Sequence, residues 1–304
     1  MLKAVIYRLC VSKARFIKAT TVNIFFQRLI LGVLGSLFLN GVAWSNPISQ
    51  PAQAVVSKIQ QLDAAEYDWI ARRIYQNEAN QNPKYLTYWS KSEPFPSFGI
   101  GHFIWIPEKL NVPFVQTFPK MVAFVSQHKP APVWLNQLSP FNPPWQNRAE
   151  FYQAWSKKPL TQLRDWLQRT QSLQAQFIAN QLIQKLEQQV QTLHPIEAEF
   201  FWQKITRLIE DKRGLFAMID YYNFKGLGAN SKEQYQGKGW GLVDVVLAMD
   251  PEQSGSVLKQ FIASAKRLLA QRVDLSPPQR NETRWLKGWY KRLDNYLING
   301  SDRT

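Results

Sequence analysis

Apolar residues recur every three or four positions over most of the chain, and this spacing predicts a mainly α fold. The first convincing helix begins at Asp63, which forms a capping box with Glu66 three positions later. Ile70 and Ile74 continue the helical stripe, and Glu78 ends it. A carboxylate therefore stands at the end of an otherwise apolar helix face.

Six later segments have the periodicity of helices. The longest runs from Pro159 until Pro195 stops it, and the next is expected to end at Gly214. Asp250-Pro251 supplies a cap and an N1 proline for another. The expected helical ranges are 159–193, 196–213, 215–223, 240–249, 251–272 and 279–298.

The remaining segments have different patterns. Residues 79–119 are rich in proline and aromatic side chains, and within them Ser97 to Trp105 is typical of a short strand or hairpin. Residues 46–62 contain proline, glutamine and serine with little periodicity, which favours a linker. Residues 129–146 are proline-rich and are expected to form a surface loop.

The N-terminus has the pattern of a secretion signal. Residues 1–28 carry basic side chains and no acidic ones, and the apolar run from Leu29 to Leu39 is too short to span a bilayer comfortably. Ala43-Trp44-Ser45 places small residues at a cleavage site after Ser45. We expect residues 1–45 to be removed and the protein to be periplasmic or secreted. An uncleaved membrane anchor is the alternative.

The composition bears on metal sites, cofactors and the kind of partner. The only cysteine, Cys10, lies inside the expected signal, and the three histidines are far apart in the sequence, so we expect no metal and no cofactor. Beyond residue 45 there are 31 basic and 22 acidic residues, a net charge of +9. This charge suits an anionic partner. Because no basic stripe or amphipathic basic helix is obvious, nucleic acid and anionic lipid are not expected.

Glu78 is the main candidate for catalysis. A partly desolvated carboxylate favours its neutral form and can donate a proton near neutral pH. Cleavage of a glycosidic bond needs such an acid to protonate the departing oxygen. The alternative is an ordinary helix-end glutamate, hydrogen-bonded to loop amides.

The segment after Glu78 resembles the lysozyme-like superfamily, in which a catalytic glutamate ends a helix and a small β-hairpin follows. Gly99-Ile100-Gly101-His102 is similar to the hairpin motif of phage-type lysozymes. In those enzymes a hydroxyl residue at the place of Ser97 helps to position water. Glycines at 99 and 101 would let the hairpin backbone approach a sugar closely.

Two other motifs resemble soluble lytic transglycosylases. Asn82-Pro83 follows Glu78, and the segment from Ala217 to Gly228 is similar to that family's Ala-x-x-x-Tyr-Asn-x-Gly-x-Gly motif, with the alanine one place early and an extra residue after Asn223. The resemblance implies that Tyr222 contacts the catalytic carboxylate or the sugar, and that Asn223 belongs to the site.

A third segment, Glu282-Thr283-Arg284, resembles a helix of the same family, where Glu282 and Arg284 would mainly hold the helices around the cleft. The Gly-Leu-Met-Gln that usually follows the transglycosylase glutamate is absent. The expected domain is a lysozyme-like helical unit at 63–304, with a small β-hairpin after the catalytic helix. A helical insertion at about 110–213 has no counterpart in either family.

The choice between hydrolase and transglycosylase depends on a second carboxylate. A hydrolase uses two carboxylates, and Glu93 is the only acidic residue between Glu78 and His102. A lytic transglycosylase needs Glu78 alone, which would also take a proton from the sugar's 6-hydroxyl. Trp240, in a glycine-rich loop at 237–241, is expected at the cleft rim.

The sequence thus predicts an enzyme that cleaves the glycan strand of peptidoglycan, as a lytic transglycosylase or a muramidase-type glycosidase. The alternative is a non-catalytic protein of the cell wall that binds glycan strands on the same scaffold. A binder of nucleic acid or anionic lipid is disfavoured by the scattered charges. Chitosan is disfavoured as a substrate because a cationic polymer would be repelled by a basic protein.

Overall fold

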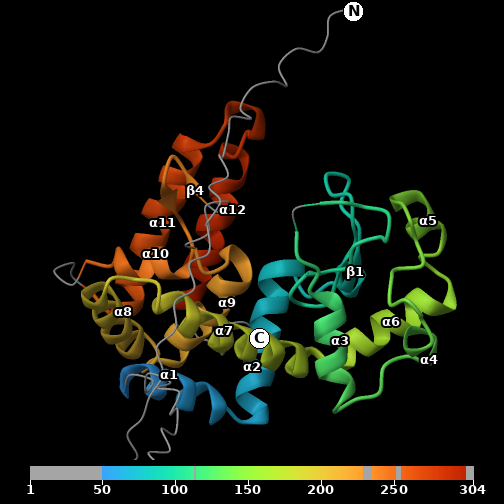
Figure 1. The fold of residues 1–304 in the computed structure, drawn as a ribbon, viewed down its shortest axis with the longest axis horizontal. Helices are drawn as coiled ribbons and strands as arrows, with labels where there is room; N and C mark the ends of the chain where they lie inside the picture. The colour runs from blue at the N-terminus through green and yellow to red at the C-terminus, as the bar shows by residue number, and fades with distance from the viewer. Residues whose placement is uncertain (1–49, 113, 229–233, 251–254, 299–304) are drawn as a thin grey trace, which may run out of the picture. The chain divides into compact units, whose positions relative to one another are not determined.

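The computed structural model describes residues 50–112, 114–228, 234–250 and 255–298. The expected signal and its cleavage site near Ser45 lie outside these residues. None of the described helices has both the length and the apolar character needed to cross a membrane. The prediction of a mainly helical fold is confirmed, because the described strands are few and each has two residues (Figure 1).

Bounds of the elements are as follows. The α-helices are α1 Gln50–Gln60, α2 Ala64–Ala79, α3 Phe118–Ser126, α4 Val133–Asn136, α5 Arg148–Gln153, α6 Lys158–Arg169, α7 Gln171–Val190, α8 Pro195–Leu208, α9 Lys212–Lys225, α10 Leu242–Leu247, α11 Val257–Leu275 and α12 Thr283–Asp294. The 3-10 turns are η1 Pro83–Leu86, η3 Pro278–Arg280 and η4 Asn295–Leu297. The strands are β1 Thr87–Tyr88, β2 Ser97–Phe98, β3 Phe103–Ile104, β4 Gln234–Tyr235 and β5 Lys238–Gly239.

Helix α2 forms as its capping box predicts. The Glu66 amide donates to the Asp63 carboxylate over 2.8 Å, and the Asp63 amide donates to Glu66 over 3.0 Å. The helix ends at Ala79, and Asn80 takes the left-handed conformation that closes many helices. Glu78 therefore lies in the last turn of α2.

The prediction of a linker at 46–62 is wrong for residues 50–60, because these residues form α1. Ala52, Val55 and Ile59 lie on one helix face and are buried. Pro51 is tolerated because it lies in the first turn, where its missing amide hydrogen is not needed. Helix α1 packs against α8 and is part of the folded unit.

Helix boundaries also differ from the prediction. The expected helix at 159–193 is two helices, α6 and α7, divided at Thr170, whose hydroxyl donates to the Trp166 carbonyl over 2.8 Å. Gly214 does not end a helix but lies inside α9, where an added Cβ would come 1.9 Å from the Leu208 carbonyl oxygen. Helix α11 begins at Val257 and is capped by Ser256, whereas Pro251 of the expected Asp250-Pro251 cap lies outside the described residues.

The hairpin region forms a three-stranded antiparallel sheet in the order β1-β2-β3. Ser97 pairs with Tyr88 on one side and with Ile104 on the other. The turn between β2 and β3 is held by the buried Gln174 of α7, which accepts a hydrogen bond from the Ile100 amide over 2.9 Å. The small β element thus forms where the sequence predicts it, and α7 fixes its position.

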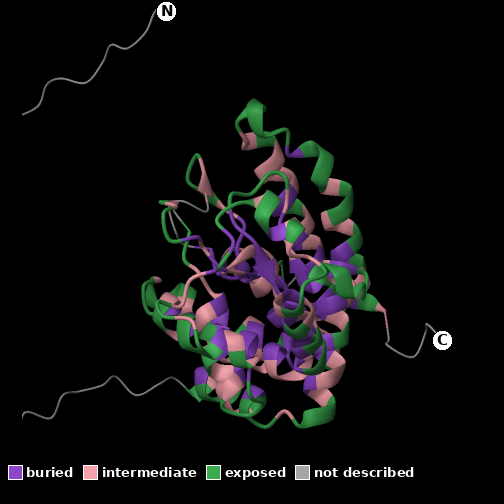
Figure 2. Ribbon diagram, turned by 90° about the vertical axis from the view of Figure 1, so that its right-hand side faces the viewer, coloured by how far each residue is buried: buried purple, intermediate pink, exposed green. Residues whose placement is uncertain are grey.

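The core of the described residues centres on α2 and α7, which pack along one another, and α7 also contacts α1, α3 and α9. Figure 2 shows buried residues on the inward sides of the helices and exposed residues on their outer sides. Because α7 belongs to the segment 110–213, the expected insertion contributes to this core. The last turn of α2 faces the end of α9 and the hairpin turn, and this junction holds the candidate site.

Candidate functional site

Glu78 is the centre of the site, with a side chain that is 15% exposed. Its Oε1 accepts a hydrogen bond from Asn223 Nδ2 over 3.1 Å and another from Arg292 Nη2 over 2.7 Å. Its Oε2 lies 3.5 Å from His102 Nδ1. The structure thus brings Glu78, His102 and Asn223 together, and one carboxylate oxygen of Glu78 accepts both hydrogen bonds.

Arg292 is a site residue that sequence reasoning missed. It lies in the last turn of α12 and is also bound to the fully buried Asp220, through Nε at 2.8 Å and Nη2 at 2.9 Å. Asp220 accepts further hydrogen bonds from Tyr296 at 2.6 Å and from Asn77 at 3.3 Å. Asp220 therefore fixes the guanidinium, and the guanidinium fixes Glu78.

The expectation that Glu78 is a neutral acid is wrong for this arrangement. Burial acts to raise the pKa of Glu78, but the charges of Arg292 and His102 and the hydrogen bonds from Arg292 and Asn223 outweigh it and lower the pKa. Glu78 is therefore an ionised carboxylate near neutral pH. Its neighbours suit it to act as a base or to stabilise a positive charge.

The hairpin turn brings His102 against Glu78. His102 has a left-handed backbone, with φ of 48°. A Cβ at Gly101 would come 3.0 Å from Asn223 Oδ1 and 2.7 Å from the ring of Phe103, so only glycine fits this approach. The other ring nitrogen of His102, Nε2, is buried and has no hydrogen-bond partner. The site thus holds one polar atom that the described protein leaves unsatisfied.

Glu93 shares its environment with His102. It is exposed and lies in the loop between β1 and β2. Loss of hydration to the surrounding protein raises its pKa, and the charge of His102 opposes this rise only in part. The two candidate carboxylates therefore differ, because the pKa of Glu93 is raised and that of Glu78 is lowered.

A groove adjoins Glu78 on the side of Asn223. Its inner pocket, of about 240 Å³, is lined by residues that include Gly101, Tyr222 and Asn223. A neighbouring pocket of about 620 Å³ shares Phe177 and Gln181 with the first, and the two adjoining pockets along α7 together are called the groove. Besides aromatic rings, this groove is lined by Lys120, Lys185 and the amides Gln60, Gln127, Asn180, Gln181, Gln184 and Asn223.

The other predicted site residues differ in where they lie relative to Glu78 and the inner pocket. Tyr222 lines the inner pocket, whereas Gly99 holds the hairpin turn with φ of +71°. Ser97 is buried in β2, where it pairs with Tyr88 and Ile104. Trp240 is 5% exposed and packs on Tyr235, so the expectation that it lies at a cleft rim is wrong.

Glu282 holds elements together as the resemblance implies. It is buried and binds Arg272 through two hydrogen bonds of 2.6 and 2.9 Å, and it accepts another from Tyr235 over 2.9 Å. The start of α12 is thereby tied to α11 and to β4. Arg284, in contrast, is exposed and lies over the ring of Trp285.

Lys225, the last residue of α9, is a second feature that the sequence did not reveal. Its Nζ lies 3.5 Å from the ring centre of Trp289 and 4.0 Å from that of Phe224. Burial, together with the charges of Arg272 and Arg292, lowers its pKa to about 6. The amine is therefore largely neutral at pH 7.

Among the described residues, no group of three or more His, Cys, Asp or Glu side chains could hold a metal ion. Comparisons of the chain with protein-family models, with curated proteins and with solved structures find no match. The site is therefore interpreted from the chemistry of its own residues.

Proposed function

We propose that this protein is an exported, lysozyme-like enzyme that cleaves the glycan strand of peptidoglycan. The observation that carries the proposal is the state of Glu78. Its Oε1 is bound by Arg292 and Asn223, while its Oε2 faces His102 next to a groove. A nearly buried carboxylate with one oxygen fixed and the other available is suited to act on a bound substrate.

The two carboxylates support a division of roles. Glycosidases commonly use one protonated and one ionised carboxyl group, and environments that separate the two pKa values assign these roles. His102 Nδ1 lies 3.5 Å from Glu78 Oε2, and the charge of His102 acts on both carboxylates. Beside this shared neighbour, the raised pKa of Glu93 suits it to protonate the leaving oxygen. The lowered pKa of Glu78 suits it to activate water or to stabilise the positive charge of an oxocarbenium-like transition state. This assignment favours hydrolysis over transglycosylation.

The groove supports a glycan as the substrate. Amide side chains can donate to and accept from hydroxyl groups, and aromatic rings can pack on the C–H faces of sugars. Lys120 and Lys185 add positive charge to the same groove. Peptidoglycan combines sugar rings with the carboxylates of its stem peptides, so it fits both features.

The experiment is digestion of purified peptidoglycan by the protein and by single variants, with the rate of release of soluble fragments as the readout. Glu78→Gln is expected to reduce the rate by about 100-fold or more, since it removes the charged group. Glu108→Gln is the matched control, because Glu108 is an exposed glutamate in the loop after β3. Equal rates for Glu78→Gln and the wild type would refute the proposal.

A second candidate, a non-catalytic binder of wall glycan, is favoured by one observation. The ion pair of Glu78 with Arg292 satisfies the carboxylate without any substrate. If no glycan is cleaved while Glu78→Gln still binds peptidoglycan as the wild type does, the binding role replaces the enzymatic one.

A further inference from the structure

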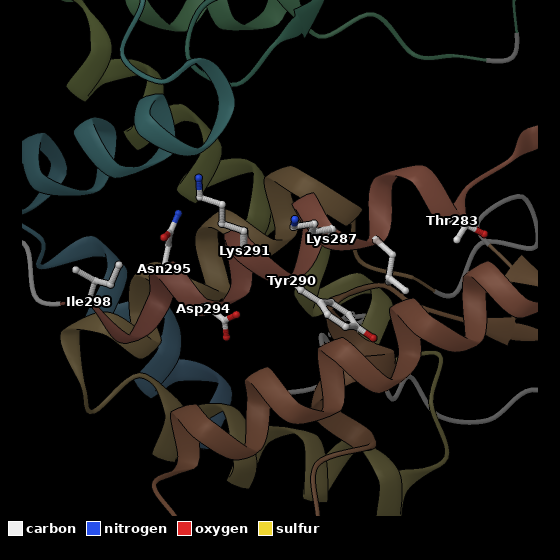
Figure 3. Close-up of a pocket in the computed structure, with 8 residues that line it drawn as sticks. Thr283, Lys287, Tyr290, Lys291, Asp294, Asn295 and Ile298 are labelled. Carbon is white, nitrogen blue, oxygen red and sulfur yellow. The ribbon is translucent and has the colours of Figure 1, made fainter.

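Three basic side chains form a line on the exposed face of α12. Arg284, Lys287 and Lys291 are three and four residues apart, so they lie on one side of the helix. All three are exposed. In Figure 3, Lys287 and Lys291 project to the same side of α12. The expectation that the chain has no amphipathic basic helix is therefore wrong for α12.

No acidic side chain of this region is left to neutralise that line. Between residues 278 and 298 the only acidic residues are Glu282 and Asp294. Glu282 is buried with Arg272 and Arg280, and Asp294 is paired with Lys266 over 2.5 Å. Arg284, Lys287 and Lys291, in contrast, form no ion pair with any residue that the structure describes. Their charge is available to a partner.

Apolar surface adjoins the basic line. A groove of about 700 Å³ runs along the same helix, and Leu286, Tyr290 and Ile298 are among the residues that line it (Figure 3). Lys287 and Lys291 line the same groove. Basic side chains beside an apolar groove are the pattern of helices that lie in the interface of a membrane.

We propose that this face of α12, with Arg284, Lys287, Lys291 and the adjoining groove, binds the surface of an anionic phospholipid bilayer. The basic side chains would meet the lipid phosphates, while the apolar residues of the groove would meet the boundary of the acyl chains. A nucleic acid or an anionic wall polymer would use the charges but would leave the apolar surface without a partner. The proposal is independent of glycan cleavage, because none of these residues contacts Glu78.

The test is sedimentation with lipid vesicles, using residues 47–304 so that the apolar run at 29–39 cannot bind lipid itself. All core residues of the structure lie between Ala52 and Tyr296, and residues 47–304 form one compact unit. The vesicles are of phosphatidylcholine alone, or of phosphatidylcholine and phosphatidylglycerol in equal parts. Binding is expected to the second kind only, and it should weaken as salt is added.

The variant R284E/K287E/K291E is expected to bind anionic vesicles at least about 100-fold more weakly, since each basic residue at such a surface contributes about fivefold. The control K91E/K109E/K158E makes the same change of charge at exposed lysines on other elements. It should lose much less affinity. Circular dichroism verifies that both variants are folded.

Two results would overturn the proposal. One is equal binding by the variant and the control, which would show that net charge alone attracts the vesicles. The other is failure of the wild type to bind anionic vesicles. If the basic residues of α12 are then needed for binding to DNA or peptidoglycan, the face binds that polymer and not a membrane.

Discussion

At the scale of single residues, the two oxygens of Glu78 have different neighbours. Oε1 is held by Arg292 and Asn223, and Oε2 lies towards His102. Asp220 holds the guanidinium of Arg292 in turn, through hydrogen bonds from Nε and Nη2. This arrangement lowers the pKa of Glu78 and keeps it ionised. In the mechanism that we propose, Glu93 would then be the proton donor.

The pH dependence of activity tests this division. Glu78 must be ionised, so kcat/KM should rise as the pH increases through its lowered pKa. Glu93 must be protonated, so kcat/KM should fall as the pH increases through its raised pKa. In Glu93→Gln the rate should be about 100-fold lower, and the decrease of kcat/KM at higher pH should disappear. A falling limb that survives in Glu93→Gln would assign the acid to another group.

Lys225 gives a second prediction, about stability. Its pKa is about 6 in the folded protein and near 10.5 in the unfolded chain, so the unfolded state binds more protons between these values. The free energy of unfolding should therefore increase with pH in this window, by at most about 1.4 kcal/mol per pH unit. Lys225→Met should be more stable than the wild type at pH 7 and should lose this slope.

Denaturant unfolding at several pH values measures this effect. Lys109→Met serves as the control, because Lys109 is exposed and its replacement should leave the slope unchanged. A wild-type slope that persists in Lys225→Met would mean that another group titrates.

Some site residues could be found in the sequence and others could not. Glu78, His102 and Asn223 stand in short motifs, and the structure brings them together. Arg292 and Asp220 are 72 positions apart, and nothing local indicates their pairing. The available signal was Asp220 itself, because a carboxylate inside a largely apolar helix needs a buried partner.

At the scale of elements, the site depends on how closely the hairpin turn approaches α9. Gly101 permits this approach, since a Cβ there would meet Phe103 and Asn223. The buried Gln174 holds the same turn from α7. The hairpin therefore positions His102 through contacts with two helices that are distant in sequence.

Gly101→Ala is expected to displace the turn and to lower the rate of glycan cleavage by about 100-fold, because a shift near 1 Å has effects of this size. Overpacking should also cost about 1–3 kcal/mol of stability. Gly288→Ala is the control, because Gly288 is in a helix and open space surrounds its Cβ position. It should gain up to about 1 kcal/mol. Full activity in Gly101→Ala would show that the turn does not position the site.

Elements with strong local signals were predicted well, and the others depended on packing. The capping box at Asp63 located the start of α2, and the two hairpin glycines located the turn. The break at Thr170 was missed because apolar spacing continues on both sides of it. Helix α1 was missed because the segment is rich in Pro, Gln and Ser, and only contact with α8 shows which of its apolar residues are buried.

At the scale of the whole molecule, the folded unit extends to α1. Ile59 is fully buried, so Ile59→Ala should cost roughly 2–5 kcal/mol of unfolding free energy. Gln60→Ala, at the neighbouring exposed position, should change stability by no more than about 0.5 kcal/mol. Denaturant unfolding distinguishes these outcomes. A negligible effect of Ile59→Ala would show that residues 50–60 do not contribute to the folded core and act as a linker.

If the protein cleaves the glycan strand with Glu78 and Glu93, the chemical form of the released sugar ends tests this most directly. Peptidoglycan is digested by the wild type, and the ends of the released fragments are identified by mass spectrometry. With Glu93 as acid and Glu78 as the ionised partner, we predict reducing ends that disappear in both Glu78→Gln and Glu93→Gln. Anhydro-sugar ends that need Glu78 but not Glu93 would contradict the two-carboxylate account, and the absence of any product would contradict the enzyme itself.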